Sequence, residues 1–445
     1  MNSSLPEFGF SVKAKRTAPQ PINYLISTAL REEKLISLAA GLVDQDSLPA
    51  EETARLSGEL LCDEVAGKGA LQYGATEGLA ELREAVLAHV CRLDGVSAAK
   101  LAVTPDNVVI ASGSQQLLYI IADILLDPGD IVITEWPSYF VFTGALVSLG
   151  ADIRAVEMDD GGIKLDALDA TLAELKRSGE LKRVKIVYLC DYYQNPTGIT
   201  LSAQRRKPLL DLIRSYSTEG RICLLEDAAY RELSCEEAAP VSIKSHEADN
   251  AQVVLAQTFS KPFAPGFRTG YAILPDELVE PVLNQKGNHD FGSSNLAQHI
   301  LLRAMSSGVY EEHVAFLRQR YRAKRDAMLE ALDEHLGRFQ PDQTRWTRPG
   351  GGLYVYLSLP DWMDTGKDSP LFAAALAEGV MYVPGEFCYG PDPRRTVPSN
   401  HMRLTFGTVD VPAIREGVAR LARAIKRVGA RAPAGAAKAS KAQSR

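Results

Sequence analysis

The stretch NVVIASGSQQLLYIIADILLD, residues 107 to 127, combines two patterns that together decide the fold. Its first part is a short apolar run that ends in Gly and Ser, as a buried strand does. Its second part repeats apolar residues with the period of a helix. The same alternation continues to about residue 275. Buried strands that alternate with helices predict an α/β fold with a mostly parallel sheet covered on both faces.

Polar residues follow four of the predicted strands. The turns after these strands hold Ser114 with Gln115, then Asn195, Asp227 and Lys261. In sheets of this kind, ligands bind beyond the carboxyl ends of the strands. We therefore expect these side chains to meet at one site.

The pattern changes at about residue 309. The segment YEEHVAFLRQRYRAKRDAMLEALDEHL, residues 310 to 336, has the period of one long amphipathic helix, and short strands and a final helix follow it. This predicts a second, smaller α+β domain. The expected parts are an N-terminal segment packing near the site and the small domain (1–45), a large domain (46–308), the small domain (309–427) and a disordered tail (428–445).

The composition argues against several classes of protein. A net charge of −7 leaves no broad basic surface, so nucleic acid is not an expected partner. The chain has no apolar run of about 18 residues and no secretory signal at its start, so we expect no contact with a membrane. The six cysteines form no CxxC pair and the seven histidines lack metal-ligand spacing. We therefore expect free thiols, a cytoplasmic location and no metal site.

The segment QTFSKPFAPGFRTGY, residues 257 to 271, carries the most informative lysine. An amine attacks an aldehyde only when it is unprotonated, so a catalytic lysine is desolvated or lies near positive charge. Arg268 can supply that charge and bind a phosphate, and Thr258 and Ser260 add hydroxyl donors. Lys261 is therefore predicted to form a Schiff base beside a phosphate. The alternative is a lysine that only caps a loop.

Three further residues suit a pyridine ring. Asp227 ends the apolar strand CLLED and can keep a ring nitrogen protonated, or it can cap a following helix. Tyr230 can reach a ring oxygen with its hydroxyl, unless that hydroxyl faces the surface. Asn195, in QNPTG, can donate to the same oxygen, although Asn-Pro also begins plain turns.

Two more motifs complete the candidate site. In SGSQQ, the backbone amides of Ser114 and Gln115 would form an anion site at a helix N-terminus, or Ser114 is an ordinary N-cap. Tyr139 follows another predicted strand and can stack on a flat ring or pack in the core. Arg403, in RLTF, can clamp a carboxylate with its guanidinium or form a surface salt bridge.

Taken together, these motifs resemble those of the class I/II aminotransferases, which are pyridoxal-phosphate enzymes of fold type I. The resemblance covers roughly residues 20 to 427. The motifs GSQQ, PSY, QNPTG and FSKPFAPGFR are most similar to the branch with 2-aminoadipate, kynurenine and aromatic aminotransferases. The resemblance implies a seven-stranded, mostly parallel sheet between helices and a smaller α+β domain.

The resemblance also implies a role for each residue toward pyridoxal 5'-phosphate. Lys261 is the Schiff-base lysine and proton shuttle, Asp227 is the partner of the ring nitrogen, and Tyr139 stacks on the ring. Asn195 and Tyr230 bind the ring oxygen. The phosphate is held by Ser114, Gln115, Thr258, Ser260 and Arg268.

The substrate and the assembly follow from the same resemblance. Arg403 is the clamp for the α-carboxylate, with Asn195 and Gly41 beside it. Tyr73, in LQYGATEG, reaches the phosphate across the interface of a homodimer with shared active sites. The expected substrates are α-amino acids and 2-oxo acids.

Two segments depart from the family pattern and leave the substrate open. No proline stands two residues after Gly41, and the segment before Asn195 reads LCDYYQ, without proline. In the similar branch, the segment KAKRTAPQPINYLISTAL folds over the site and adapts to different side chains. Here it offers Arg16 for a distal carboxylate, with Tyr24 and Leu25 for apolar contact, or it packs on the surface. An aromatic or 2-aminoadipate-like donor is therefore expected.

The leading hypothesis is an aminotransferase that moves an amino group from such an amino acid to a 2-oxo acid. A second hypothesis keeps the cofactor and breaks another bond, as a β-lyase, a decarboxylase or an oxidase does. A third is a regulator with an aminotransferase-like domain, which would need a DNA-binding module. A fourth is a non-catalytic homologue, which the joint presence of Lys261, Asp227 and Arg403 disfavours.

Overall fold

The structure is a computed structural model that describes residues 8–20, 35–236 and 239–430. Its centre is a sheet that has eight strands among these residues, in the order β2-β9-β8-β7-β6-β3-β4-β5. The strands are β2 (Val108–Ala111), β3 (Ile131–Trp136), β4 (Asp152–Asp159), β5 (Gly162–Ile163), β6 (Val184–Leu189), β7 (Cys223–Asp227), β8 (Val253–Thr258) and β9 (Gly270–Ile273). Seven of them are the expected strands, and β5 is a two-residue addition at the edge.

The sheet is mostly parallel, as the alternating pattern predicts. Strands β3, β4, β6, β7 and β8 pair in parallel. Strand β9 runs antiparallel to both β2 and β8, and β5 runs antiparallel to β4. Because β9 follows β8 after a short loop, the chain can return beside it without a crossover helix.

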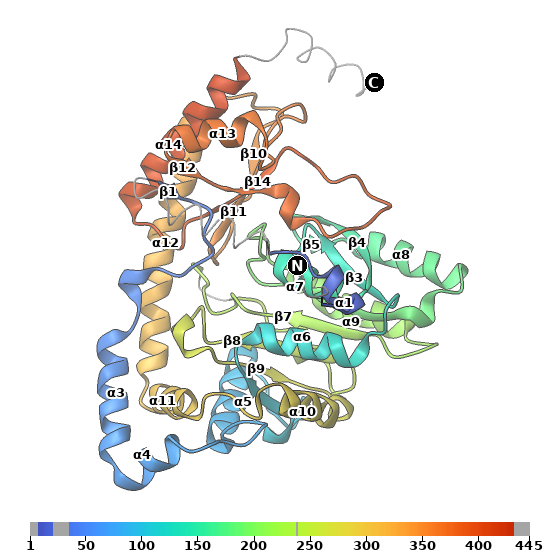
Figure 1. Cartoon of the computed structure of the whole chain (residues 1–445), viewed down its shortest axis with the longest axis vertical. Helices are drawn as coiled ribbons and strands as arrows, with labels where there is room; N and C mark the ends of the chain where they lie inside the picture. Colours follow the sequence, from blue (N-terminus) through green and yellow to red (C-terminus); the bar gives the residue numbers. More distant parts are fainter. Residues whose placement is uncertain (1–7, 21–34, 237–238, 431–445) are drawn as a thin grey trace, which may run out of the picture.

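Helices cover both faces of the sheet (Figure 1). Alternate side chains of β3 enter different cores: Ile131 and Ile133 pack with α8 (Leu165–Arg177) and α9 (Ala203–Tyr216), whereas Val132 joins the main core. The other helices of this part are α5 (Ala80–Asp94), α6 (Ser114–Leu125), α7 (Phe140–Leu149), α10 (Asp276–Asp290) and α11 (Asn295–Ser306). Burial on both faces explains why the strands are continuous apolar runs.

A second sheet begins after the long helix α12 (Val309–Leu336), which packs on α14 (Val411–Gly429). Its order is β10-β11-β14-β13, and all neighbouring pairs are antiparallel. The strands are β10 (Arg345–Trp346), β11 (Tyr354–Ser358), β13 (Val383–Pro384) and β14 (His401–Thr405). Helix α13 (Pro370–Ala377) packs on α14 and on β12 (Val380–Met381), at the top of Figure 1.

The N-terminal segment contacts both parts of the molecule. Strand β1 (Ile36–Ser37) pairs with β12 (Val380–Met381) beside the small sheet. The short helix α1 (Val12–Arg16) lies instead on the large part, against α7. Helices α3 (Ala50–Cys62) and α4 (Glu64–Ala70) follow at the lower edge in Figure 1. No helix of the described residues is long and apolar enough to cross a lipid bilayer.

Candidate active site

A pocket of about 920 Å³, including its mouth, opens where the two sheets face each other. It lies beyond the carboxyl ends of β2, β6, β7 and β8, as expected for a sheet of this kind. Strands β11 and β14 supply the opposite wall. Twelve of the residues predicted for the site line it: Gly41, Ser114, Gln115, Tyr139, Asn195, Asp227, Tyr230, Thr258, Ser260, Lys261, Arg268 and Arg403.

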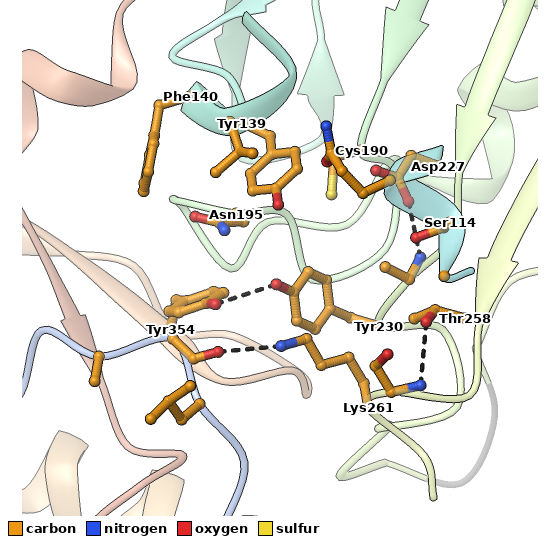
Figure 2. A pocket seen from close by; sticks show the side chains of 18 of the residues that line it. Ser114, Tyr139, Phe140, Cys190, Asn195, Asp227, Tyr230, Thr258, Lys261 and Tyr354 are labelled. Carbon is orange, nitrogen blue, oxygen red and sulfur yellow. Dashed lines mark hydrogen bonds between the residues drawn. The ribbon is translucent and has the colours of Figure 1, made fainter. Parts of the chain in front are cut away.

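Lys261 points into the pocket from the turn after β8 (Figure 2). Its Nζ donates a hydrogen bond to the carbonyl of Gly41 at 3.1 Å. Desolvation, followed by the charges of Arg403 and Arg268, lowers the pKa of the Lys261 amine to about 8. About a tenth of this amine is then unprotonated at pH 7 and about half at pH 8, and the unprotonated form is the one that a nucleophilic or basic lysine requires.

Asp227 is buried at the end of β7. The hydroxyl of Tyr188 donates to its Oδ2 at 2.9 Å, and the backbone N–H of Ala229 donates to its Oδ1 at 3.3 Å. Both donors are neutral, and burial raises the pKa of the Asp227 carboxyl to about 6. Residues 228–233 form turns rather than a helix, so this carboxylate does not cap a helix. A cation placed beside it would remove the cost of its burial.

An anion site lies at the N-terminus of α6. Its N-cap, Gly113, has φ +85° and makes no side-chain cap, so the first backbone N–H groups of the helix are available to a ligand. A Cβ on Gly113 would come within 2.8 Å of the Arg268 guanidinium. Arg268 also donates to Ser260 Oγ at 3.4 Å. The buried Oε1 of Gln115 lacks a partner among the described residues.

Arg403 is held on β14 at the opposite wall. Its two terminal nitrogens donate to Asn195 Oδ1 at 2.8 Å and to the carbonyl of Ala39 at 2.7 Å. The guanidinium carbon lies 4.4 Å from the ring centre of Tyr354 and 5.6 Å from that of Phe140. Arg403 is only 1% exposed and makes no ion pair among the described residues, so the surface salt bridge considered from the sequence is not formed.

The two predicted tyrosines also reach the pocket. Tyr139 stands immediately before α7, and burial raises the pKa of its hydroxyl. Tyr230 is buried, and its hydroxyl lies 3.1 Å from the hydroxyl of Tyr354. Lys261 Nζ lies 5.8 Å from the ring centre of Tyr230. Both phenols are therefore neutral donors that face the same space as the lysine (Figure 2).

Two predicted residues that the structure describes, Tyr73 and Arg16, do not line this pocket. Tyr73 is 82% exposed and packs edge-on against Phe291, away from Lys261. Arg16 donates to the carbonyl of Leu149 at the far end of α7, so the structure does not bring it to the pocket. Tyr24 and Leu25 lie outside the described residues.

The structure adds residues that the sequence analysis missed. Tyr354 and Phe140 flank Arg403, and Leu42 and Cys190 complete the wall. Tyr354 lies in the predicted strand GGLYVYLSL, where an inward-facing tyrosine looks like any core residue. The one available indication was the strand's alternating pattern: if this strand pairs with the strand that carries Arg403, alternate side chains of both strands share a face.

These donors fit pyridoxal phosphate. Its phosphate matches the α6 N-terminus with Arg268, its aldehyde matches the Lys261 amine, and its protonated ring nitrogen matches the Asp227 carboxylate. Among the described residues, the buried Oε1 of Gln115 has no hydrogen-bond partner, and burial raises the pKa of Asp227. Both features indicate a pocket that holds a polar, charged group.

Comparisons with known proteins agree with this site. Residues 33–421 match the family described as aminotransferase class I and II. Aromatic-amino-acid aminotransferase 1 of Thermococcus litoralis is 34% identical over 94% of each chain. The 2-aminoadipate transaminase of Thermus thermophilus is 34% identical over 88% of this chain and 90% of its own. Kynurenine aminotransferase of Pyrococcus horikoshii, solved with PMP, has a TM-score of 0.84 at 34% identity, covering 94% of this chain and 97% of its own.

The chain therefore belongs to the class I and II aminotransferase family. It is an enzyme of fold type I, a pyridoxal-phosphate-dependent aminotransferase. The fold, the enzyme class and the cofactor predicted from the sequence are confirmed.

Proposed function

We propose that this aminotransferase moves the amino group of an α-amino acid with an aromatic or a long polar side chain to a 2-oxo acid. The observation that carries the proposal is the buried guanidinium of Arg403, which faces the pocket without a carboxylate partner among the described residues. A planar guanidinium matches a substrate carboxylate in two parallel hydrogen bonds. Asn195 and Ala39 hold it in orientation.

The side-chain preference is argued from the wall around Arg403. Leu42, Phe140, Val141 and Tyr354 present apolar and aromatic surface to the pocket, which suits an aromatic ring. The similar proteins are named for aromatic amino acids, 2-aminoadipate and kynurenine, which supports the same range. For an acidic donor, Arg16 would have to leave its bond to Leu149.

Pyridoxal phosphate, when bound, supplies an electron sink for the bond that breaks at the substrate Cα. Asp227 holds the proton on the ring nitrogen, and its burial makes that charge pair strong. Asn195 and Tyr230 would bind the ring oxygen, and Tyr139 would pack on the ring. Ser114, Gln115, Thr258, Ser260 and Arg268, which all line the pocket, would hold the phosphate.

Lys261 moves the proton. With a pKa near 8, its Nζ can take a proton from the substrate Cα and return it to a neighbouring atom at neutral pH. Arg403 orients the substrate so that the Cα proton faces the amine.

The proposal extends to the assembly and the location. We infer a homodimer in which Tyr73 of one subunit completes the phosphate site of the other, and domains with boundaries near residues 45, 308 and 427. All six cysteines are free thiols, which supports a reducing, cytoplasmic compartment. The expected partners are small amino acids and 2-oxo acids.

A panel of amino donors tests the function. The purified enzyme is mixed with aromatic, acidic and short amino acids, and with matching amines that lack the α-carboxylate, while the absorbance of bound pyridoxal phosphate is followed. We expect aromatic or 2-aminoadipate-like donors to react best and the amines to fail. Arg403→Lys should lower kcat/KM about 10- to 100-fold, because lysine cannot make the two-pronged contact.

Arg345→Lys is the matched control, since Arg345 lies on β10 of the same small sheet and is exposed. It should leave kcat/KM unchanged. Amines that react as well as the amino acids, or an Arg403→Lys enzyme equal to the control, would remove Arg403 from substrate binding.

A further inference from the structure

Tyr354 contacts two residues of the proposed active site, Tyr230 and Arg403, which is more than core packing alone requires. It lies at the start of β11, is 1% exposed and lines the pocket. Its hydroxyl is 3.1 Å from that of Tyr230, and its ring centre is 4.4 Å from the guanidinium carbon of Arg403. Figure 2 shows Tyr354 and Tyr230 meeting at the centre of the pocket.

The strand register explains the contact with Arg403. On paired strands, Tyr356 is opposite Arg403 and Tyr354 is opposite Thr405. Tyr354 and Arg403 are therefore diagonal neighbours on one face of the small sheet, within reach of long side chains. A guanidinium above a buried ring gains a cation–π contact and loses freedom to swing.

Gly41 shows how closely the hydroxyl of Tyr354 is packed. A Cβ on Gly41 would lie 2.7 Å from Tyr354 Oη, which is closer than such atoms approach. The carbonyl of Gly41 accepts the hydrogen bond from Lys261 Nζ. The hydroxyl is thus held between the segment that contacts Lys261 and the hydroxyl of Tyr230.

The direction of the bond between the two hydroxyls follows from their donors. A tyrosine has one O–H group to donate. If Tyr230 donates it to the ring oxygen of the cofactor, as proposed above, the hydroxyl of Tyr354 must donate to Tyr230 Oη. A hydrogen bond donated by Tyr354 to Tyr230 Oη would polarise the O–H group of Tyr230. It would thereby strengthen the hydrogen bond from Tyr230 to the ring oxygen.

We propose that Tyr354 is a positioning residue that joins the two halves of the site: its ring orients Arg403 for the substrate carboxylate, and its hydroxyl orients and polarises Tyr230 toward the cofactor. The inference about the hydroxyl rests on the proposed role of Tyr230. The two functions belong to different atoms of one side chain, so different substitutions separate them.

The experiment compares Tyr354→Phe, which removes only the hydroxyl, with Tyr354→Leu, which also removes the ring. One readout is the pH midpoint of the absorbance change of bound pyridoxal phosphate. The other is the dissociation constant of 3-phenylpropionate, an unreactive carboxylate, from the holoenzyme. Tyr230→Phe is the reference, and Tyr382→Phe is the control, since Tyr382 bonds the Thr365 carbonyl outside the pocket.

Tyr354→Phe should raise the pH midpoint by a few tenths of a unit, in the same direction as Tyr230→Phe and by less. It should bind 3-phenylpropionate within about twofold of the unaltered enzyme, because the ring remains. Tyr354→Leu should raise the pH midpoint by a similar amount and raise the dissociation constant of 3-phenylpropionate roughly tenfold. The control should move neither readout.

Each half of the proposal can fail separately. If Tyr230→Phe shifts the midpoint and Tyr354→Phe does not, the link between the hydroxyls is refuted while the role of Tyr230 stands. If Tyr230→Phe leaves the midpoint unchanged, the role proposed for Tyr230 is refuted and the link falls with it. Should Tyr354→Leu bind 3-phenylpropionate as tightly as Tyr354→Phe, the ring does not orient Arg403.

Discussion

Burial moves the pKa values of Asp227 and Lys261 in opposite directions, because the largest cause of each shift is the loss of water around a charge. The Asp227 carboxyl has a pKa of about 6 and the Lys261 amine one of about 8. In the apoprotein the first group is costly to ionise and the second is easy to deprotonate. Each group is therefore prepared for a ligand that offers a cation to the one and an aldehyde to the other.

The first prediction concerns Asp227→Asn. The folded carboxyl has a pKa of about 6, above its value in an unfolded chain, so its contribution to stability is lost as the pH rises toward 6. Above pH 6, Asp227→Asn should raise the free energy of unfolding of the apoprotein by about 1–3 kcal/mol. Urea denaturation at pH 4 and pH 7.5 measures this, and the difference should shrink at the lower pH.

The same substitution should lower turnover at least about a hundredfold, because a neutral amide cannot hold the proton on the ring nitrogen. A variant that is more stable as apoprotein and nearly inactive as holoenzyme would show that the carboxylate is kept for function. Near-normal turnover, or an apoprotein of unchanged stability at both pH values, would contradict this.

The second prediction concerns Lys261. The rate of covalent attachment of pyridoxal phosphate to the apoprotein should rise with pH, reach half its maximum near pH 8, where half of the amine is unprotonated, and level off about one pH unit higher. Borohydride reduction and peptide mapping should place the label on Lys261. Lys261→Ala should still bind the cofactor but take up no label, and label on another lysine would overturn the assignment.

At the scale of elements, one glutamine ties together the ends of β3 and β6. Gln194 Nε2 donates to Glu135 Oε2 at 2.7 Å and to the carbonyl of Pro137 at 3.1 Å. Its Oε1 accepts from Thr197 Oγ1 at 2.5 Å. The loop that carries Asn195 is thereby bound to the loop that leads to Tyr139.

The third prediction is that Gln194→Ala loosens both loops. It should lower the free energy of unfolding by about 1–3 kcal/mol, because Glu135 loses a buried partner. It should also weaken the binding of 3-phenylpropionate, because Asn195 would no longer hold Arg403 in place. Gln252→Ala is the control, because Gln252 is also buried and donates to Ser217 Oγ and to the carbonyl of Ile222. Gln252→Ala should lower the free energy of unfolding by a similar amount and leave the binding of 3-phenylpropionate unchanged. If both variants weaken that binding equally, Gln194 does not act by holding the two loops together.

At the scale of the whole molecule, apolar side chains gather on the surface around α3 and α4. Leu61, Val65, Leu71, Tyr73 and Phe291 are exposed by 45%, 84%, 68%, 82% and 61%. Tyr73 and Phe291 contact each other there, with ring centres 5.6 Å apart. An exposed apolar patch of this kind is typical of an interface, and two-fold dimers are the commonest closed assembly.

The fourth prediction is that this patch makes a dimer in which Tyr73 serves the partner's site. Tyr73→Phe should weaken the binding of pyridoxal phosphate to the homodimer. Mixed dimers of Tyr73→Phe with Lys261→Ala should regain one normal site, because the unaltered lysine of one subunit meets the unaltered tyrosine of the other. Cofactor titration of the isolated mixed dimer measures this. If the normal site does not return, or the active protein is a monomer, Tyr73 does not act across an interface.

The alternating strands and helices, and the residues at the strand ends, could be predicted from the amino-acid sequence. Apolar periodicity is local, and a polar side chain after a buried strand of a parallel sheet has one edge to occupy. Ser114, Asn195, Asp227 and Lys261 therefore meet where the pattern predicts, and they line one pocket.

The distant segments that face that pocket could not be predicted in this way, because their positions depend on the folding of the whole chain. The antiparallel placement of β9, the diagonal contact of Tyr354 with Arg403 and the position of Arg16 at the end of α7 depend on pairing between residues far apart in the chain. Local periodicity carries no information about such pairings, because a buried tyrosine in a strand has the same pattern whether it packs in the core or orients a catalytic group.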